Sequence, residues 1–313
     1  MASGRSVCFG GGRGFPRLAG VTNPHDASQP ATQPNYVRVY GNDHSPWVQA
    51  VLLGLHQKKI AHTLVTVPPL SVFLNSGILM PAARIDAGSW LLDSERILVE
   101  LGFSDVDPDA RRALLGIFRS SALRRADAPW TFWHRFSQAR DGHAMLPRRL
   151  WNHFWRSFSI FYFFTLITMF SRRVPEVAPE RLAQQFSYFQ DRLGAGAAFL
   201  GGETPDTIDF QLFGLVQMCS TIPGPPLAVL QEGPNLDRLR DWIAAMQRRF
   251  SDYTHLYTAQ DFEPRFPEIE RATPLERFFY WSGAVLMWVA FPITVPAALF
   301  LARRLRKKGL MSS

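Results

Sequence analysis

The sequence predicts an α/β domain that is followed by a helical domain and then by a membrane segment. Between residues 36 and 101, short β-type runs alternate with stretches whose apolar residues recur at helical spacing. Residues 207–250 show helical spacing only, and residues 278–302 form a run of 25 residues without a charge. The length of 313 residues is also that of about two domains.

The first element of the α/β domain is a strand that leads through a turn into a helix. Residues 37–40 are β-branched or aromatic and predict a strand, and residues 41–44 form a turn-type cluster. Ser45 suits a helix N-cap and Pro46 suits the first helical position. A hydroxyl at this place lies near free backbone amides and the positive end of the helix dipole, which favour a thiolate over a thiol. The alternative is that Ser45 only caps the helix.

Two further signals follow the first helix. Met80-Pro81 precedes residues 82–85, which predict an edge strand, and the simplest alternative is an ordinary strand-entry proline. Asp93-Ser94 opens a helix whose apolar positions are Ile97, Leu98 and Leu101. A hydroxyl and free amides at a helix start form an anion site, although simple helix capping also explains this pair.

In this order and at this spacing, the three signals resemble the glutathione-binding half of a glutathione transferase. The resemblance implies a thioredoxin-like domain at residues 36–104, in which Pro81 follows a cis peptide bond. It further implies that Ser45 donates a hydrogen bond to the glutathione sulfur, and that the backbone of Met80 pairs with the peptide.

The resemblance also gives roles to the third signal. Ser94 would hold the carboxylate at the γ-glutamyl end of glutathione, and Asp93 would face its ammonium group. The family usually has Glu at the first of these positions, so Asp93 shortens the reach by one methylene.

The second half of the chain extends the resemblance to about residues 36–260. Residues 199–209 look like the segment that caps a buried helix in the family's C-terminal domain, with Asp206 and Asp209 as N-cap and N3 acid. Residues 234–236 lead into 239–250, which look like the last long helix. An all-helical domain is therefore expected at residues 108–260.

Charge and cysteine content exclude several function classes. The formal charge of +8 is concentrated at the ends: residues 303–313 carry +5 and residues 1–35 carry +2, which leaves +1 for the body. A nearly neutral body predicts no nucleic-acid partner. The only cysteines are Cys8 and Cys219, which is compatible with a reducing compartment and not with a disulfide framework. No metal-ligand cluster is predicted.

The uncharged run at residues 278–302 exceeds the roughly 20 residues that a helix needs to cross a bilayer. We expect a linker at 261–277 before it and a basic tail at 303–313 after it. Residues 1–35 are expected to be disordered and lack the apolar core of a signal peptide, so the soluble domains should face the cytoplasm. A basic tail outside would oppose the positive-inside preference, so a hairpin broken at Pro292 and Pro296 and a tail anchor both remain open.

A second apolar stretch, residues 157–171, is too short for a typical span. It predicts a core helix, with one face exposed to an apolar ligand or to the membrane surface as the functional interpretation.

Taken together, these features predict a membrane-anchored, glutathione transferase-like enzyme that uses glutathione as co-substrate on an apolar electrophile. The competing hypothesis is a non-catalytic scaffold of the same fold at a membrane surface. Expected partners are glutathione, the electrophile, membrane lipid and, because dimers are common in the family, a second copy of the chain.

Overall fold

The structure is a computed structural model of the whole chain. It describes residues 34–77, 79–121, 140, 142, 145–171, 179–222, 224–263 and 270–307, all within one compact unit. Disorder was expected for residues 1–35, of which residues 1–33 lie outside the described residues.

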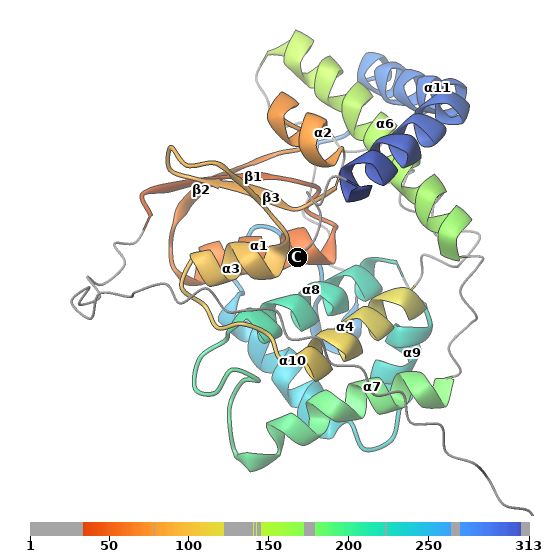
Figure 1. Ribbon diagram of the computed structural model, residues 1–313. Helices are drawn as coiled ribbons and strands as arrows, with labels where there is room; N and C mark the ends of the chain where they lie inside the picture. The colour runs from red at the N-terminus through yellow and green to blue at the C-terminus, as the bar shows by residue number, and fades with distance from the viewer. Residues whose placement is uncertain are drawn as a thin grey trace, which may run out of the picture. The chain divides into compact units, whose positions relative to one another are not determined.

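The N-terminal part is a four-stranded mixed sheet with helices on both faces (Figure 1). The strand order is β2-β1-β3-β4, with β1 parallel to β2 and antiparallel to β3. In Figure 1, α1 and α3 lie on one face of this sheet and α2 lies on the other. This is the thioredoxin-like arrangement that the resemblance implied. Its elements are β1 (Tyr36–Tyr40), α1 (Pro46–Gln57), β2 (Ala61–Val65), α2 (Leu70–Ser76), β3 (Ala82–Ile85), β4 (Trp90–Leu92) and α3 (Ser94–Glu100).

The second part is helical and packs against α1 and α3. Helix α8 is buried along its whole length and contacts α1, so one continuous apolar core joins the sheet domain to the helices. The helices are α4 (Pro108–Ser120), α7 (Pro179–Arg192), α8 (Thr207–Thr221), α9 (Pro225–Glu232) and α10 (Asp237–Arg249), with short 3-10 turns at Leu193–Ala195 and Gln260–Phe262.

Asp209 fixes the start of α8. Its carboxylate accepts hydrogen bonds from the backbone N–H groups of Leu200, Gly201 and Asp206 at 2.8, 2.8 and 3.0 Å, and from Nε1 of Trp242 at 2.7 Å. Asp206 and Asp209 form the capping box that the sequence indicated.

Two long helices, α6 (Leu146–Ser171) and α11 (Pro274–Lys307), pack against each other. They enclose an apolar cluster of their own, which includes Phe161, Tyr280 and Met287. Gly283 permits the close approach, because a Cβ there would lie 2.2 Å from the carbonyl oxygen of Phe154. The apolar stretch 157–171 is thus a packed helix as expected, but its partner is α11.

Helix α11 begins at Pro274 and runs through Pro292 and Pro296 to Lys307 without a break. The helix therefore starts inside the segment expected to be a linker, and the structure has no hairpin at the two prolines. A proline removes one backbone hydrogen bond but is tolerated where neighbouring groups compensate.

Candidate functional site

The loop between β1 and α1 places Ser45 at the helix N-terminus. Its backbone is extended (φ −73°, ψ 126°), and its carbonyl oxygen accepts the N–H of Gln49 at 2.8 Å, as an N-cap does. The Ser45 hydroxyl, however, makes no capping hydrogen bond to the helix. The Ser45 side chain therefore does not cap the helix in the structure. Ser45 is half-buried and lies at the helix N-terminus.

The Met80-Pro81 peptide bond is cis. Met80 contacts the first loop, because the backbone N–H of Asn42 donates to its Sδ at 3.3 Å. Pro81 contacts the third signal, because its carbonyl oxygen accepts the N–H of Asp93 at 3.3 Å. The three segments that the sequence singled out are thereby brought to one end of the sheet. Residues 82–85 were expected to be an edge strand, but β3 lies between β1 and β4.

Asp93 caps α3, since its Oδ1 accepts the N–H of Glu95 at 2.9 Å. Its backbone has φ 79°, a region that residues other than glycine rarely occupy and that often marks a ligand site. Ser94 is only 5 % exposed, and its hydroxyl accepts a hydrogen bond from Nε2 of Gln211 on α8 at 3.3 Å. Of the predicted residues, Ser94 is therefore turned towards the helical domain.

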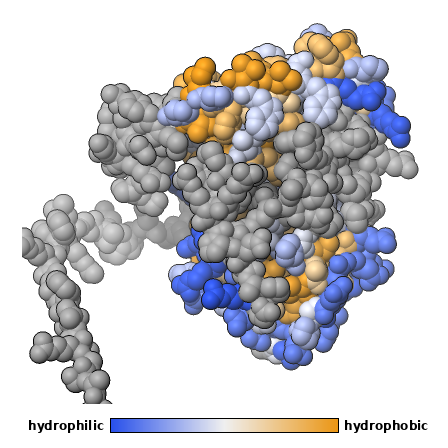
Figure 2. All heavy atoms as spheres, turned by 90° about the vertical axis from the view of Figure 1, so that its right-hand side faces the viewer, coloured by the Kyte–Doolittle hydropathy of each residue, from blue (hydrophilic) through white to orange (hydrophobic). Residues whose placement is uncertain are grey.

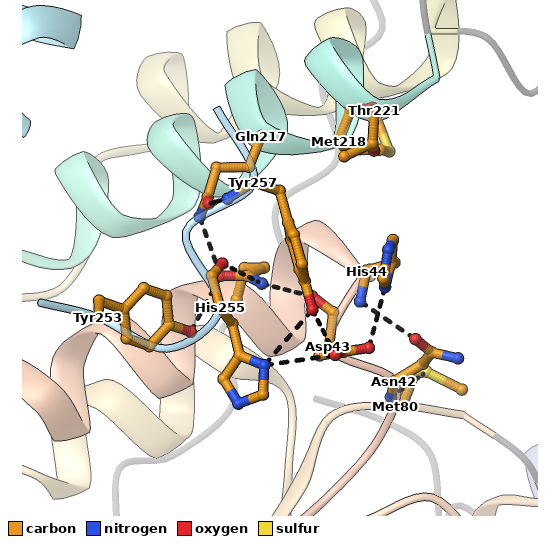
Figure 3. A network of polar contacts seen from close by, with 11 residues as sticks. Asn42, Asp43, His44, Met80, Gln217, Met218, Thr221, Tyr253, His255 and Tyr257 are labelled. Carbon is orange, nitrogen blue, oxygen red and sulfur yellow. Dashed lines mark hydrogen bonds and ion pairs between the residues drawn. The ribbon is translucent and has the colours of Figure 1, made fainter. Parts of the chain in front are cut away.

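A polar network beside Ser45 centres on the carboxylate of Asp43 (Figure 3). Asp43 lies between His44, whose Nδ1 is 2.9 Å from Oδ1, and His255, whose Nδ1 is 3.3 Å from Oδ2. The hydroxyl of Tyr257 donates to Oδ2 at 2.5 Å, and its ring stacks on His44. The segment after α10 thus covers the loop that carries Ser45.

The two histidines favour the charged form of the Asp43 carboxyl. Burial by itself would raise the pKa of the Asp43 carboxyl, but charge and hydrogen bonds from His44 and His255 hold that pKa well below its usual value. Burial and the Asp43 carboxylate both raise the pKa of Tyr257, so its phenol stays a donor. Asp43 is two residues before Ser45 in the sequence, and a carboxylate there would oppose a thiolate.

Gln49 connects this network to α8. Its Nε2 donates to the carbonyl oxygen of Asp43 at 2.5 Å, while its Oε1 accepts from Gln217 Nε2 at 2.9 Å and from the Tyr253 hydroxyl at 3.0 Å. The site is therefore built by both domains, because α1, α8 and the segment after α10 each contribute to it.

The sequence interpretation missed most of this network. Asp43, His255 and Tyr257 were not singled out, because 214 positions separate Asp43 from Tyr257 and no local pattern connects them. From the sequence alone, an aspartate in a turn beside His44 is expected to be solvated, whereas the fold leaves its side chain only 22% exposed.

An open cavity of about 660 Å³ lies elsewhere, at the opposite end of α1 from Ser45. Its lining includes Lys58, Phe103 and Asp206. It shares no residue with the three signals or with the Asp43 network, so it is not part of the candidate site.

Comparisons with known proteins identify similar solved structures. No family model matches the sequence, and no curated protein is similar to it. Glutathione transferase F2 from Populus trichocarpa is 16% identical, with a TM-score of 0.37, over 70% of this chain and 95% of that one. Poplar glutathione transferase F1 is 14% identical, with a TM-score of 0.42, over 70% and 96%.

A glutathione S-transferase from Methylobacterium radiotolerans, solved with glutathione sulfonate, is 18% identical, with a TM-score of 0.40, over 76% of this chain and 100% of that one. At these identities and TM-scores, the similarities assign neither a family nor an activity to this chain.

One helix in the described part of the chain is by itself long and apolar enough to cross a membrane. It is the stretch Pro274–Pro296 of α11, and 28% of its most apolar 18 residues are buried. Most of these 18 residues are thus left uncovered by the rest of the protein.

Proposed function

We propose that this chain binds glutathione and transfers it to an apolar electrophile at a membrane. The observation that carries the proposal is the convergence of the three segments: Asn42 contacts Met80, and Pro81 contacts Asp93, each at 3.3 Å. A cis X-Pro bond, an uncapped hydroxyl at a helix N-terminus and a second helix N-terminus form a surface suited to an extended, charged peptide.

Each predicted residue has one task in this proposal. The Ser45 hydroxyl donates to the sulfur, while the α1 dipole and backbone amides lower the pKa of the thiol. The thiol proton leaves to solvent. The thiolate then either adds to an activated C=C bond, whose π electron pair takes a proton from water, or displaces a leaving group, which departs with the electron pair of its bond to the electrophilic carbon. The backbone of Met80 pairs with the peptide next to Pro81, and Asp93 and Ser94 bind the γ-glutamyl end.

The membrane part of the proposal rests on α11. Its uncovered apolar surface would anchor the enzyme, with the soluble domains on the cytoplasmic side. Apolar electrophiles concentrate in lipid, so an anchored enzyme works where its electrophilic substrate is most abundant.

A second candidate function is a scaffold of the same fold that does not bind glutathione. Ser94 favours it, because this residue is 5 % exposed and its hydroxyl already accepts a hydrogen bond from Gln211. The O–H can still donate, but at this burial a ligand carboxylate could reach it only if the side chain became more exposed.

Calorimetric titration of the full chain in lipid nanodiscs with glutathione separates the two candidates. The full chain is needed because removing α11 would uncover the apolar face of α6 around Phe161 and Phe164. Ser45→Ala and Ser94→Ala are compared with Ser187→Ala, a control on α7 whose hydroxyl bonds only its own helix.

The enzyme proposal expects saturable binding that Ser94→Ala weakens. It expects Ser45→Ala to raise the pKa of the bound thiol, which is read from thiolate absorbance, and Ser187→Ala to change neither. If the unsubstituted chain is folded but gives no heat on titration with glutathione, and glutathione does not displace a bound analogue, the scaffold is the function that remains.

A further inference from the structure

Helix α2 presents apolar side chains to the outside. Leu70, Phe73 and Leu74, at positions i, i+3 and i+4 on one face, are 71%, 48% and 72% exposed, and Leu79 beyond the helix is 57% exposed. On the opposite face, Val72 is 2% exposed and packs against the sheet. Leu70, Phe73 and Leu74 thus share one exposed face of α2, and together with Leu79 we call them the α2 face.

The sequence around the α2 face lacks charge. No Asp, Glu, Lys, Arg or His occurs in residues 64–83, a stretch of 20 residues in a chain whose charged fraction is 19%. Water-facing helices of soluble domains carry charged residues on their exposed side. The α2 face therefore has the composition of a surface that is covered, although the described part of the chain does not cover it.

Helix α11 also has a row of exposed apolar side chains. Phe278, Val285, Val289 and Ile293 are 65%, 62%, 67% and 74% exposed and lie on one side of the helix. They extend over about 22 Å of helix axis, most of the hydrocarbon thickness of a bilayer. Figure 2 shows apolar surface gathered at the end where α6 and α11 lie, and in Figure 1 α2 is on the side of the sheet towards that end.

We propose that the α2 face is a second membrane contact, which inserts into the lipid surface of the bilayer that α11 enters. This inference rests on the proposed membrane anchoring and does not depend on glutathione binding. Three exposed apolar side chains on a short helix and one beyond it are far fewer than the 20–30 residues per side that a stable protein interface uses. They suffice for contact with lipid, because α11 already holds the chain at the membrane, and each inserted side chain then adds its own binding free energy.

The contact has a consequence for the candidate site. Leu79 is the neighbour of Met80 in the sequence, so insertion of the α2 face holds the Met80-Pro81 edge at the lipid surface. An electrophile dissolved in the bilayer would then reach Ser45 with a short path through water.

Site-directed fluorescence in vesicles tests the proposal with the full chain. In a Cys8→Ser, Cys219→Ala background, Leu74→Cys carries a nitrobenzoxadiazole probe, and the vesicles are phosphatidylcholine with or without nitroxide-labelled lipid. Val289→Cys on α11 reports anchoring, and Leu115→Cys on α4, which is 38% exposed, is the control away from the membrane. Leu70→Cys repeats the measurement if Leu74→Cys does not fold.

The expected result is that probes at 74 and 289 emit at shorter wavelength and are quenched by nitroxide lipid, whereas the probe at 115 is not. Quenching at 289 without quenching at 74 would overturn the α2 contact and leave the anchor intact. Loss of quenching at 289 would overturn both. A blue-shifted probe at 74 that nitroxide lipid does not quench would identify a second copy of the chain as the cover and would also overturn the proposal. Glutathione titration of the same variants reports the proposed enzyme function independently.

Discussion

The rings of His44 and Tyr257 stack with their centroids 4.4 Å apart and an angle of 27° between their planes. This contact joins the residue before Ser45 to a segment that follows the last helix of the helical domain. Because the Tyr257 hydroxyl also donates to Asp43, one side chain closes the candidate site both by packing and by a hydrogen bond.

Tyr257→Phe separates these two contributions. The substitution keeps the stacked ring but removes a hydrogen bond to a charged group, so we expect the free energy of unfolding to fall by about 2 kcal/mol. Tyr253→Phe, which removes a bond to the neutral Gln49 side chain, should cost about 1 kcal/mol. Urea unfolding of both variants measures the difference, and equal losses would contradict the charged state of Asp43.

Ser45→Ala should leave stability nearly unchanged but impair chemistry. Since the hydroxyl makes no capping bond, we expect a loss below about 0.5 kcal/mol. Asp107→Ala is the positive control: Asp107 caps α4 by accepting the N–H of Ala110 at 2.8 Å and also bonds Tyr188 and Arg192, so its removal should cost at least about 1 kcal/mol. If the enzyme proposal holds, Ser45→Ala lowers turnover by about 10²–10³-fold. A stability loss equal to that of Asp107→Ala would restore the capping role of Ser45.

Asp209→Asn should destabilise the helical domain. The carboxylate accepts four N–H groups, and an amide can accept only through one oxygen while its own N–H₂ group opposes the remaining donors. We expect a loss of about 3 kcal/mol in the free energy of unfolding. Asp206→Asn, which keeps an accepting oxygen, is the control and should cost less. Thermal unfolding of the two variants provides the test.

Acid should destabilise the contact between α4 and α7 below pH 4. Burial acts to raise the pKa of Asp107, but the N–H of Ala110, Arg192 and Tyr188 lower it to about 2. A carboxyl whose pKa is lower in the folded than in the unfolded state contributes stability above its unfolded pKa of about 4. That contribution is lost as pH falls from about 4 to 2. Asp107→Asn should therefore flatten the pH dependence of the unfolding midpoint over this window, and an unchanged slope would contradict it.

Gly283→Leu should separate α6 from α11. The added side chain would begin 2.2 Å from the carbonyl oxygen of Phe154, so the helices must move apart and lose the packing of Phe161 on Tyr280. Ser282→Ala, one position away, is the control, because it removes only a hydrogen bond from the Ser282 hydroxyl to the carbonyl oxygen of Phe278 in the same helix. Cysteine cross-linking between the two helices reports the separation, which the control should not show.

The sequence determined much of the local structure, because local structure depends on neighbours in the chain. Alternating burial in β1, the turn before Ser45 and the Asp206–Asp209 capping box all follow from residues within a few positions of one another. The cis bond at Pro81 was expected only from the order of the three signals, since a dipeptide alone does not specify it.

Partners that are distant in the sequence were decided by the tertiary structure alone. The apolar residues of 157–171 predicted a packed helix but not that α11 would cover it, because apolar packing has no direction and any matching face can serve. Likewise, Asp43 and Tyr257 acquire their roles only when the fold brings the Tyr257 hydroxyl and His255 to a partly buried carboxylate. The sequence by itself thus determined several strands, helices and caps, among them β1, α1 and the start of α8, but not β2 or α2. The tertiary structure decided which elements meet, since that depends on shape and burial summed over the whole chain.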